Sequence, residues 1–217
     1  MIIKTKINKD TINLSYLHIL LQTFIKKNKY IGNICLDYKN NIRIDNNYIP
    51  FLFCNKIIFK YNHTFQQNNK LLSNNIRKIV LTLCNNITEL TCIGGESFIY
   101  PILLNLTYYN FYSDSIKLVD ESLFNSKIYK IKNNSTVINY NICNNINCCE
   151  NLILNLDTLN YNLLKIINIK NIKNIIIINC NHKDFWKKMK YLTNFKIKKR
   201  YKFISKNYFI TVSLLNY

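Results

Sequence analysis

The chain has 217 residues, 48% of them hydrophobic and 13% aromatic, so it can bury the core of one good-sized domain but is too short for two full ones. Its formal net charge of +19 favours an anionic partner, with nucleic acid expected ahead of an acidic membrane surface. The same composition, rich in Asn, Ile, Lys and Tyr, is also what the codon supply of an AT-rich genome would produce without selection for binding.

Membrane, secretion and metal signals are weak. No apolar run approaches the roughly 18 residues that a membrane span requires, so we expect a soluble protein. The N-terminus lacks the features of a signal peptide, and the eight cysteines are therefore expected to be reduced thiols in the cytoplasm or another reducing intracellular compartment. Potential metal ligands exist, but no C-x-x-C spacing is present, and we predict no metal site from Cys143, Cys148, Cys149, Cys180 and His182.

Residues 1–85 are expected to form a small α+β extension. Apolar residues at helical spacing predict a helix from Asp10 or Asn13 to about residue 27. Apolar runs separated by Asn-rich turns predict an antiparallel β appendage, at residues 31–37, 41–44 and 51–59. A second helix is expected over residues 70–83, where apolar side chains recur every three or four positions.

Residues 86–217 alternate short apolar runs with longer amphipathic segments, which predicts an α/β domain with a mostly parallel sheet. Five strands are expected, at residues 87–92, 116–119, 137–140, 152–156 and 175–179. Helices are expected at residues 97–108, 161–169 and 184–192. The two last runs, 195–204 and 208–215, are separated by a short polar turn and should pair as an antiparallel hairpin.

Gly94 and Gly95 follow the first expected strand of this domain and are two of only three glycines in the chain. Adjacent glycines permit positive φ angles and let a ligand approach the backbone. In an open α/β sheet such a turn lies at the carboxyl edge, where ligands bind. A tight turn without a ligand is the alternative.

Five β/α units closed by an antiparallel hairpin form a layout that resembles the Rossmann-like methyltransferases, which use S-adenosylmethionine. The segment Cys-Ile-Gly-Gly-Glu-Ser resembles the first motif of that superfamily. The sequence of residues 87–95 is most similar to that of the trimethylguanosine-synthase-like RNA methyltransferases. The resemblance implies S-adenosylmethionine as cofactor and RNA as acceptor. It assigns cofactor binding to Cys92, Gly94, Gly95, Glu96, Asp120 and Asn141.

Asp120 ends the second expected strand, where the superfamily places an acidic residue on the ribose hydroxyls. A carboxylate suits that role because it accepts two hydroxyl protons. The alternative is that Asp120 and Glu121 are solvated residues at a strand end.

A second resemblance is to the uracil-C5 RNA methyltransferases, and it covers Phe65-Gln-Gln-Asn and Ile178-Asn-Cys-Asn-His. It implies that Cys180 is the nucleophile, because a thiolate that adds to the base activates the adjacent carbon. The sequence departs from that family at Ile210, where a glutamate would stand, and at residues 155–159, where Asp-Pro-Pro or Asp-Pro-Ala would stand. The alternative for Cys180 is a buried small apolar residue.

Whether the protein is expected to be an enzyme depends on the residues at the end of the fourth expected strand. Amino-group methyltransferases carry there an Asn or Asp, two prolines and an aromatic residue. Asp157 keeps the carboxylate and is the candidate for facing the acceptor, whereas residues 158–160 supply neither proline nor ring, and Tyr161 follows one turn later. Since methyl transfer depends on positioning, the alternative is a catalytically inactive subunit that binds RNA or scaffolds a larger complex.

A basic strip near the C-terminus is the expected nucleic-acid contact. Lysines and an arginine are interleaved with Trp186, Tyr191 and Tyr201, a pattern that can follow phosphates and stack bases. The expected contacts are Lys187, Lys188, Lys198, Lys199 and Arg200. A solvated face of a lysine-rich protein is the alternative.

Overall fold

The computed structural model describes residues 33–36, 42–45, 48–53, 56–61, 70–139, 146–156, 163–164, 167, 171–180, 182–205 and 208–217. The chain divides into two compact units, Met1–Thr64 and Phe65–Tyr217. The helix expected before residue 28 lies outside the described residues.

The smaller unit contains two antiparallel hairpins, which agrees with the expected antiparallel β appendage, but the single strand expected at 51–59 is divided between two strands. β1 (Asn33–Leu36) pairs with β2 (Ile42–Asp45), and β3 (Ile49–Phe53) pairs with β4 (Lys56–Lys60). The helix α2 (Lys70–Leu83) has the bounds expected from its periodicity but belongs to the larger unit. The larger unit therefore begins at Phe65, before the boundary expected at residue 86.

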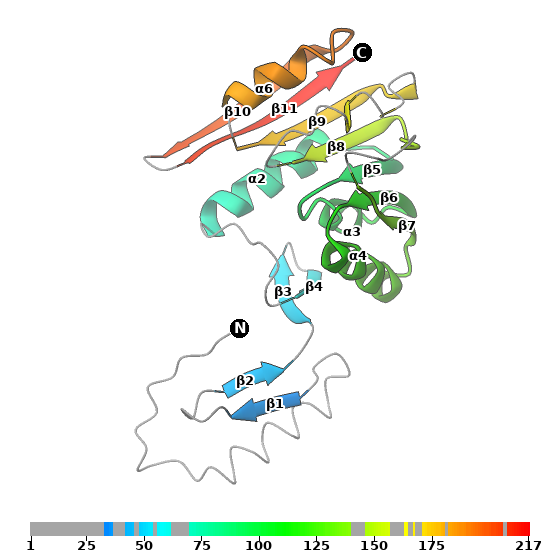
Figure 1. The fold of residues 1–217 in the computed structure, drawn as a ribbon, viewed down its shortest axis with the longest axis vertical. Coiled ribbons are helices and arrows are strands. Elements are labelled where there is room, and N and C mark those ends of the chain that lie inside the picture. The colour runs from blue at the N-terminus through cyan, green and yellow to red at the C-terminus, as the bar shows by residue number, and fades with distance from the viewer. Residues whose placement is uncertain are drawn as a thin grey trace. The chain divides into compact units, whose positions relative to one another are not determined.

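The larger unit is built on a seven-stranded sheet with the order β10-β11-β9-β8-β5-β6-β7 (Figure 1). The five strands from β9 to β7 are parallel, and β11 is antiparallel to both β9 and β10. This arrangement confirms a mostly parallel sheet with a C-terminal antiparallel hairpin. The strands are β5 (Glu89–Ile93), β6 (Tyr108–Ser113), β7 (Lys132–Val137), β8 (Asn151–Asn155), β9 (Asn174–Asn179), β10 (Lys196–Ser205) and β11 (Tyr208–Asn216).

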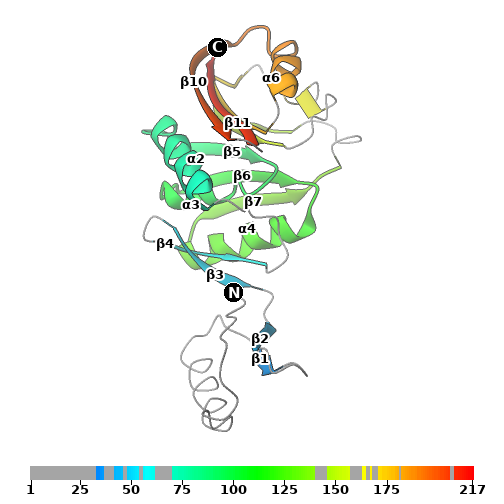
Figure 2. The ribbon, with the colours of Figure 1, turned by 90° about the vertical axis from the view of Figure 1, so that its left-hand side faces the viewer.

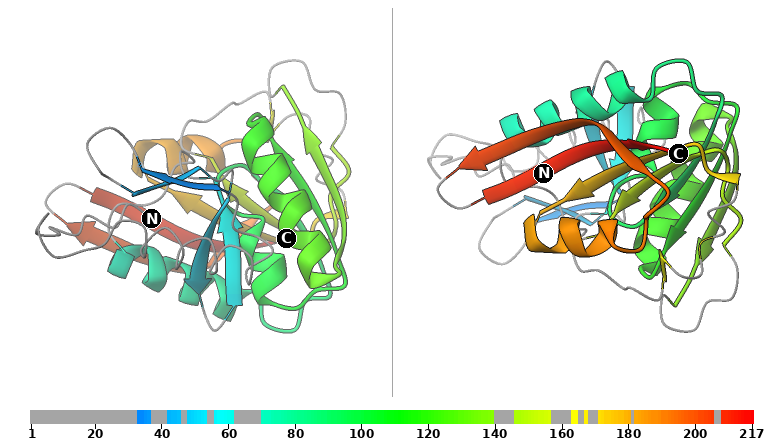
Figure 3. Two further views of the ribbon diagram at one scale, coloured as in Figure 1. Left: turned by 90° about the horizontal axis from the view of Figure 1, so that it is seen from below. Right: turned by 90° about the horizontal axis from the view of Figure 1, so that it is seen from above.

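Helices cover both faces of this sheet (Figures 2 and 3). On one face α2 contacts α3 (Ile99–Leu103), which in turn contacts α4 (Ile116–Tyr129). On the other face α6 (His182–Met189) packs on β9 and β11. Neighbouring residues of β11 show the two sides, because Leu214 lines a cavity with α2 whereas Leu215 joins a cluster with Phe185 of α6.

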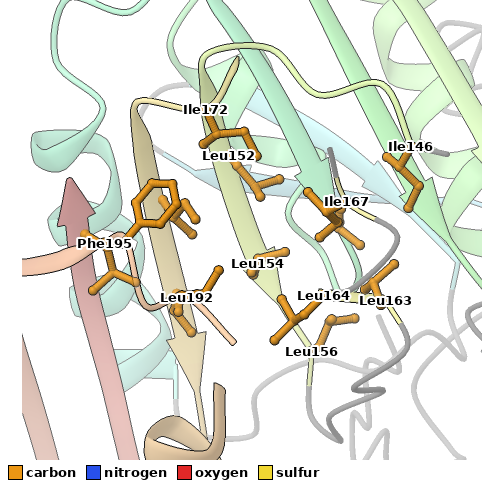
Figure 4. Close-up of a cluster of buried hydrophobic side chains, with 14 of the residues drawn as sticks. Ile146, Leu152, Leu154, Leu156, Leu163, Leu164, Ile167, Ile172, Leu192 and Phe195 are labelled. Atoms are coloured by element: carbon orange, nitrogen blue, oxygen red, sulfur yellow. The ribbon is translucent and has the colours of Figure 1, made fainter. Parts of the chain in front are cut away.

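That cluster, on the α6 side of the sheet, is the apolar core around β8 and β9 (Figure 4). Both strands were expected from their apolar runs, and their central residues are buried. Of the helix expected over 161–169, only Leu163, Leu164 and Ile167 are described, and all three are buried in this cluster.

The strand expected at residues 116–119 is wrong, because these residues begin α4. The second parallel strand is β6, in the segment between the helix expected at 97–108 and the strand expected at 116–119. The helix observed before it is the five-residue α3. β7 likewise lies before the strand expected at 137–140. The physical reason is composition: β6 reads Tyr-Tyr-Asn-Phe-Tyr-Ser, and the edge strand β7 is mostly polar.

Candidate functional site

The strand order reverses between β5 and β8. From β5 the chain proceeds to β6 and β7 on one side, and β8 and β9 continue on the other. Ligands of open α/β sheets bind at such a reversal, outside the carboxyl ends of the strands. Here those ends are the glycine turn after β5 and residues Asn155 and Leu156 at the end of β8.

The glycine turn needs its two glycines for conformation. Gly94 has a φ of 75° and Gly95 a φ of 50°, both in the left-handed region that side chains disfavour. The Gly94 amide donates to the Tyr112 carbonyl at the end of β6 (2.8 Å), and the Ser97 hydroxyl donates to the Gly94 carbonyl (2.6 Å). The turn is thus fixed to the second strand and closed on itself. Ser97 closes it instead of capping the next helix.

The glycines also make room for the end of β8. A Cβ atom on Gly94 would lie 2.4 Å from Cδ2 of Leu156, and one on Gly95 would lie 2.5 Å from Nδ2 of Asn155. Figure 4 shows Leu156 in the apolar cluster beside Leu163 and Leu164. Among the described residues, it is therefore Asn155 and Leu156 that approach the two glycines closely enough to exclude a side chain. They cover the main chain of the turn, which does not form an open face.

A cavity opens next to this contact, with an empty volume of about 520 Å³ including the part open to solvent. Its walls come from the glycine turn, α2, α3 and the ends of β8, β9 and β11. They comprise Ser73, Ile76, Arg77, Gly95, Glu96, Tyr100, Asn155, Ile178, Cys180 and Ile210.

An ion pair forms one wall of the cavity. Arg77 of α2 donates from Nε to the Oε1 atom of Glu96 (3.0 Å), and its Nη2 also contacts that oxygen. The Arg77 side chain is 5% exposed and that of Glu96 15%, so the pair is largely desolvated. The pair joins α2 to the glycine turn. Sequence reasoning identified Glu96 but missed Arg77, which is one of only three arginines in the chain.

The acidic residue at the end of the second strand is Asp114, and not Asp120. Asp120 lies in α4, whereas Asp114 is exposed directly after β6. Ser113 fixes the backbone there, since its carbonyl accepts from the Ile138 amide (2.8 Å) and its hydroxyl from the Ser115 amide (3.1 Å). The carboxylate therefore lies at the carboxyl edge, on the strand next to β5. The signal in the sequence was the Ser-Asp-Ser that follows an aromatic run.

The two cysteines assigned from sequence lie in different surroundings. Cys180 is exposed at the end of β9 and lines the cavity with Ile210. Cys92 is fully buried inside β5, and burial raises the pKa of its thiol well above the usual value. Its side chain is thus part of the core and does not reach the cavity. Asp157 and Asn141 lie outside the described residues.

The expected basic strip is divided by the fold. Lys187, Lys198 and Lys199 are exposed, whereas Lys188 is fully buried. Lys188 donates to the Asn179 side-chain oxygen (2.5 Å) and to the Leu156 carbonyl (3.3 Å). The expectation that Lys188 contacts nucleic acid is therefore wrong. Its position on the helix places it among the core residues, where it ties the end of β8 to the end of β9.

Arg200 of β10 packs over aromatic rings. Its Cζ atom lies 4.1 Å from the Phe185 ring centroid and 5.3 Å from that of Trp186. Burial lowers the pKa of its guanidinium from the usual value. Its Nε and Nη2 atoms are buried and make no hydrogen bond to the described residues, so these atoms do not face solvent.

Across the described residues, no group of three or more His, Cys, Asp or Glu side chains is placed to hold a metal ion. None of the helices that the structure describes is both long and apolar enough to cross a membrane.

No family model matches the sequence, and no curated protein matches it. Solved structures do match. The Pyrococcus abyssi tRNA (uracil-54, C5)-methyltransferase in complex with S-adenosyl-L-homocysteine is 16% identical over 85% of this chain and 48% of that chain, with a TM-score of 0.66. M. jannaschii TYW2 in complex with AdoMet is 7% identical over 81% and 90%, with a TM-score of 0.57. The N-methyltransferase NodS from Bradyrhizobium japonicum WM9 is 8% identical over 69% and 98%, with a TM-score of 0.52.

These likenesses concern the fold. The larger unit has the Rossmann-like fold of the S-adenosylmethionine-dependent methyltransferases, with the expected mostly parallel sheet and antiparallel hairpin. The chain spans about half the length of the tRNA (uracil-54, C5)-methyltransferase. Because the fold serves different reactions, the activity has to be argued from the site.

Proposed function

We propose that this chain is a methyltransferase that uses S-adenosylmethionine and acts on RNA. The observation that carries the proposal is the cavity at the carboxyl ends of β5, β8 and β9, beside the reversal of strand order. The matched tRNA (uracil-54, C5)-methyltransferase was solved with S-adenosyl-L-homocysteine and TYW2 with AdoMet, which supports the same cofactor here. The tRNA substrate of the former supports RNA as the acceptor.

Four residues of the carboxyl edge are proposed to hold this cofactor. When bound, S-adenosylmethionine supplies an electrophilic methyl group. Gly95 and Glu96 border the cavity on the side of the turn and are proposed to hold the methionine part. The exposed carboxylate of Asp114 can accept hydrogen bonds from both ribose hydroxyls. Asn141, after β7, is proposed as a further contact.

Two residues are proposed to face the acceptor. Asp157 follows Leu156, whose carbonyl is held by Lys188 at the edge of the sheet. Cys180 is exposed at the end of the adjacent strand and lines the cavity. The roles differ: a carboxylate at the end of β8 accepts a hydrogen bond from an amine, whereas a thiolate adds to a pyrimidine ring and activates the neighbouring carbon.

Transfer of tritium from methyl-labelled S-adenosylmethionine to an unmodified tRNA transcript pool tests the activity. Label in the RNA is the expected result. A Cys180→Ala variant without activity would assign pyrimidine-carbon chemistry, and an inactive Asp157→Ala variant would assign amine chemistry. Folded protein that binds the cofactor but transfers no label to any RNA of the pool would contradict the proposal that it acts on tRNA-like substrates.

A catalytically inactive subunit that binds RNA or scaffolds a complex is the second candidate. The observation that favours it is the packing of Leu156 across Gly94, which covers main chain that a cofactor would otherwise approach. This candidate predicts salt-sensitive RNA binding that Asp157→Ala leaves unchanged, with no label transfer by the wild-type protein.

A further inference from the structure

A row of positive charge lies along the exposed face of α6 and the turn after it. Lys183 and Lys187 lie four residues apart on the same side of α6, and Lys190 is the first residue after its end at Met189. All three are exposed. Two aromatic side chains accompany the row, since Trp186 is 47% exposed and Tyr191 is 39% exposed.

The Trp186 ring packs against Arg200 and Phe185. Arg200 lies against both Trp186 and the fully buried Phe185, and the two rings meet edge to face at a centroid distance of 5.3 Å. A guanidinium within about 6 Å of an indole face is attracted to it. Because the Nε and Nη2 atoms of Arg200 are buried, we assign Arg200 to holding the Trp186 ring, and not to contacting phosphate.

The rest of the basic strip separates onto two faces of the edge strand β10. Lys199 is paired with Leu214, and Lys198 lines a cavity with Leu214 and α2. Lys202 is paired with Thr211, which in turn is paired with Asn179, the residue that binds Lys188 of α6. Lys202 therefore belongs to the α6 face, whereas Lys198 and Lys199 lie on the α2 side.

The start of α6 lies at the same edge of the sheet as the cavity. α6 begins at His182, two residues after Cys180, which follows β9 and lines the cavity. The β10–β11 hairpin extends beyond that end, because β9 stops opposite Thr211 while β11 starts at Tyr208 (Figure 1). A strand of RNA that follows the lysine row toward the start of α6 would thus reach the carboxyl edge of the sheet, and would pass around that edge to the cavity, which is walled by α2 on the other face.

The segment that contains α6 and β10 carries a large excess of positive charge. Residues 182–205 contain nine lysines and arginines and one aspartate. A row of lysines attracts any polyanion, but an exposed aromatic ring beside it adds an affinity for unstacked bases, which duplexes and lipid headgroups do not offer.

We propose that the exposed face of α6 is the docking surface for single-stranded RNA, with phosphates on Lys183, Lys187, Lys190 and Lys202 and a base stacked on Trp186. This inference rests on the proposed function in taking the docked RNA to be the acceptor, but the binding itself does not require catalysis.

Fluorescence anisotropy of the intact chain with a labelled 20-nucleotide single-stranded RNA tests the surface. Neutralising two lysines in Lys187→Gln/Lys190→Gln should weaken binding and lower the slope of log K against log salt by about 1.4, since each phosphate contact contributes about 0.7 for single strands. Lys117→Gln/Lys127→Gln, which removes two exposed lysines of α4, is the matched control and should leave the slope unchanged.

The stacking residue is tested separately. Trp186→Ala should weaken single-strand binding by about tenfold, whereas Trp186→Phe should retain most of it because a ring remains. When the same RNA sequence is annealed as a duplex, both variants should bind it with nearly the wild-type affinity. Circular dichroism and thermal unfolding confirm that both variants are folded.

Three results would overturn the docking surface: equal loss of affinity in the α4 control, equal binding by Trp186→Ala and Trp186→Phe, or preferential binding to anionic phosphatidylserine vesicles over RNA. Titration of the same preparations with S-adenosylmethionine separates the two proposals. RNA binding with the expected dependences but no cofactor binding would sustain the surface and contradict the methyltransferase. Binding of the cofactor together with an RNA affinity that the α6 substitutions leave unchanged would sustain the methyltransferase and contradict the docking surface.

Discussion

Arg77 of α2 and Glu96 of the glycine turn form a largely buried ion pair, with Nε 3.0 Å from Oε1. The pair links the helix before the sheet to the turn at its carboxyl edge, and both residues line the candidate cavity. The ion pair therefore helps to fix α2 against the turn and to shape the cavity.

Arg77→Met should lower the free energy of unfolding by about 3 kcal/mol, because it leaves the Glu96 carboxylate in a poorly solvated place without its partner. Urea unfolding monitored by circular dichroism measures the loss. The double variant Arg77→Met/Glu96→Leu should be more stable than the single one, since no unpaired charge remains. If the two substitutions were additive, the ion pair would not be the cause.

Adjacent lysines of α6 should respond differently to the same substitution. Lys188→Met removes the donor to Asn179 and to the Leu156 carbonyl, and we expect it to cost about 2 kcal/mol of unfolding free energy. Lys187→Met changes an exposed side chain and should stay within about 0.5 kcal/mol of wild type. Similar losses in the two variants would refute the structural role of Lys188.

Asp114→Asn should weaken binding of S-adenosylmethionine by roughly tenfold, the effect of removing a charged hydrogen-bond acceptor. Asp120→Asn, in α4, should bind as wild type does. Isothermal titration compares the two, and both variants are checked for folding. The opposite ranking would show that the ribose is held from the helix and would count against the assignment of Asp114.

Alkaline pH should destabilise the protein through its buried thiols. Burial raises the pKa of Cys84 from its ordinary 9.0 to about 12. The unfolded chain releases this proton near pH 9 and the folded chain only near pH 12, so the free energy of unfolding falls as pH rises through that window. The slope is about 1.4 kcal/mol per pH unit for one thiol.

Urea unfolding of wild type and Cys84→Ala between pH 8 and pH 11 measures this effect. The variant is expected to lose stability less steeply above pH 9, and the difference between the two curves removes the contribution of lysines and tyrosines. Parallel curves would mean that Cys84 ionises equally easily in both states.

Sequence reasoning located β8, β9 and α2 well because their apolar residues are the signal. β8 and β9 are buried on both faces, and α2 has a regular apolar stripe. β6 was missed because its buried polar groups are satisfied by distant partners. The Tyr109 hydroxyl contacts that of Ser122 (2.8 Å), and the Asn110 amide donates to the sulfur of Cys149 (3.6 Å). Such partners are not visible along the sequence.

The misplaced strand also explains why Asp120 was chosen over Asp114. Lys188 is a different case, because a signal was present. Phe185, Lys188 and Leu192 are spaced by three and four residues and are all buried, so helical periodicity alone would have placed Lys188 on the core side of α6. Charge composition obscured that spacing. The ion pair of Arg77 with Glu96, nineteen residues apart, required the fold.

Isothermal titration of the intact, folded chain with S-adenosylhomocysteine tests the central claim most directly, because it requires neither an acceptor nor turnover. We predict one binding site per chain, with affinity reduced by Asp114→Asn and unaffected by Asp120→Asn. Absence of binding heat from folded protein across several temperatures would contradict the claim that the carboxyl edge of this sheet is a cofactor site.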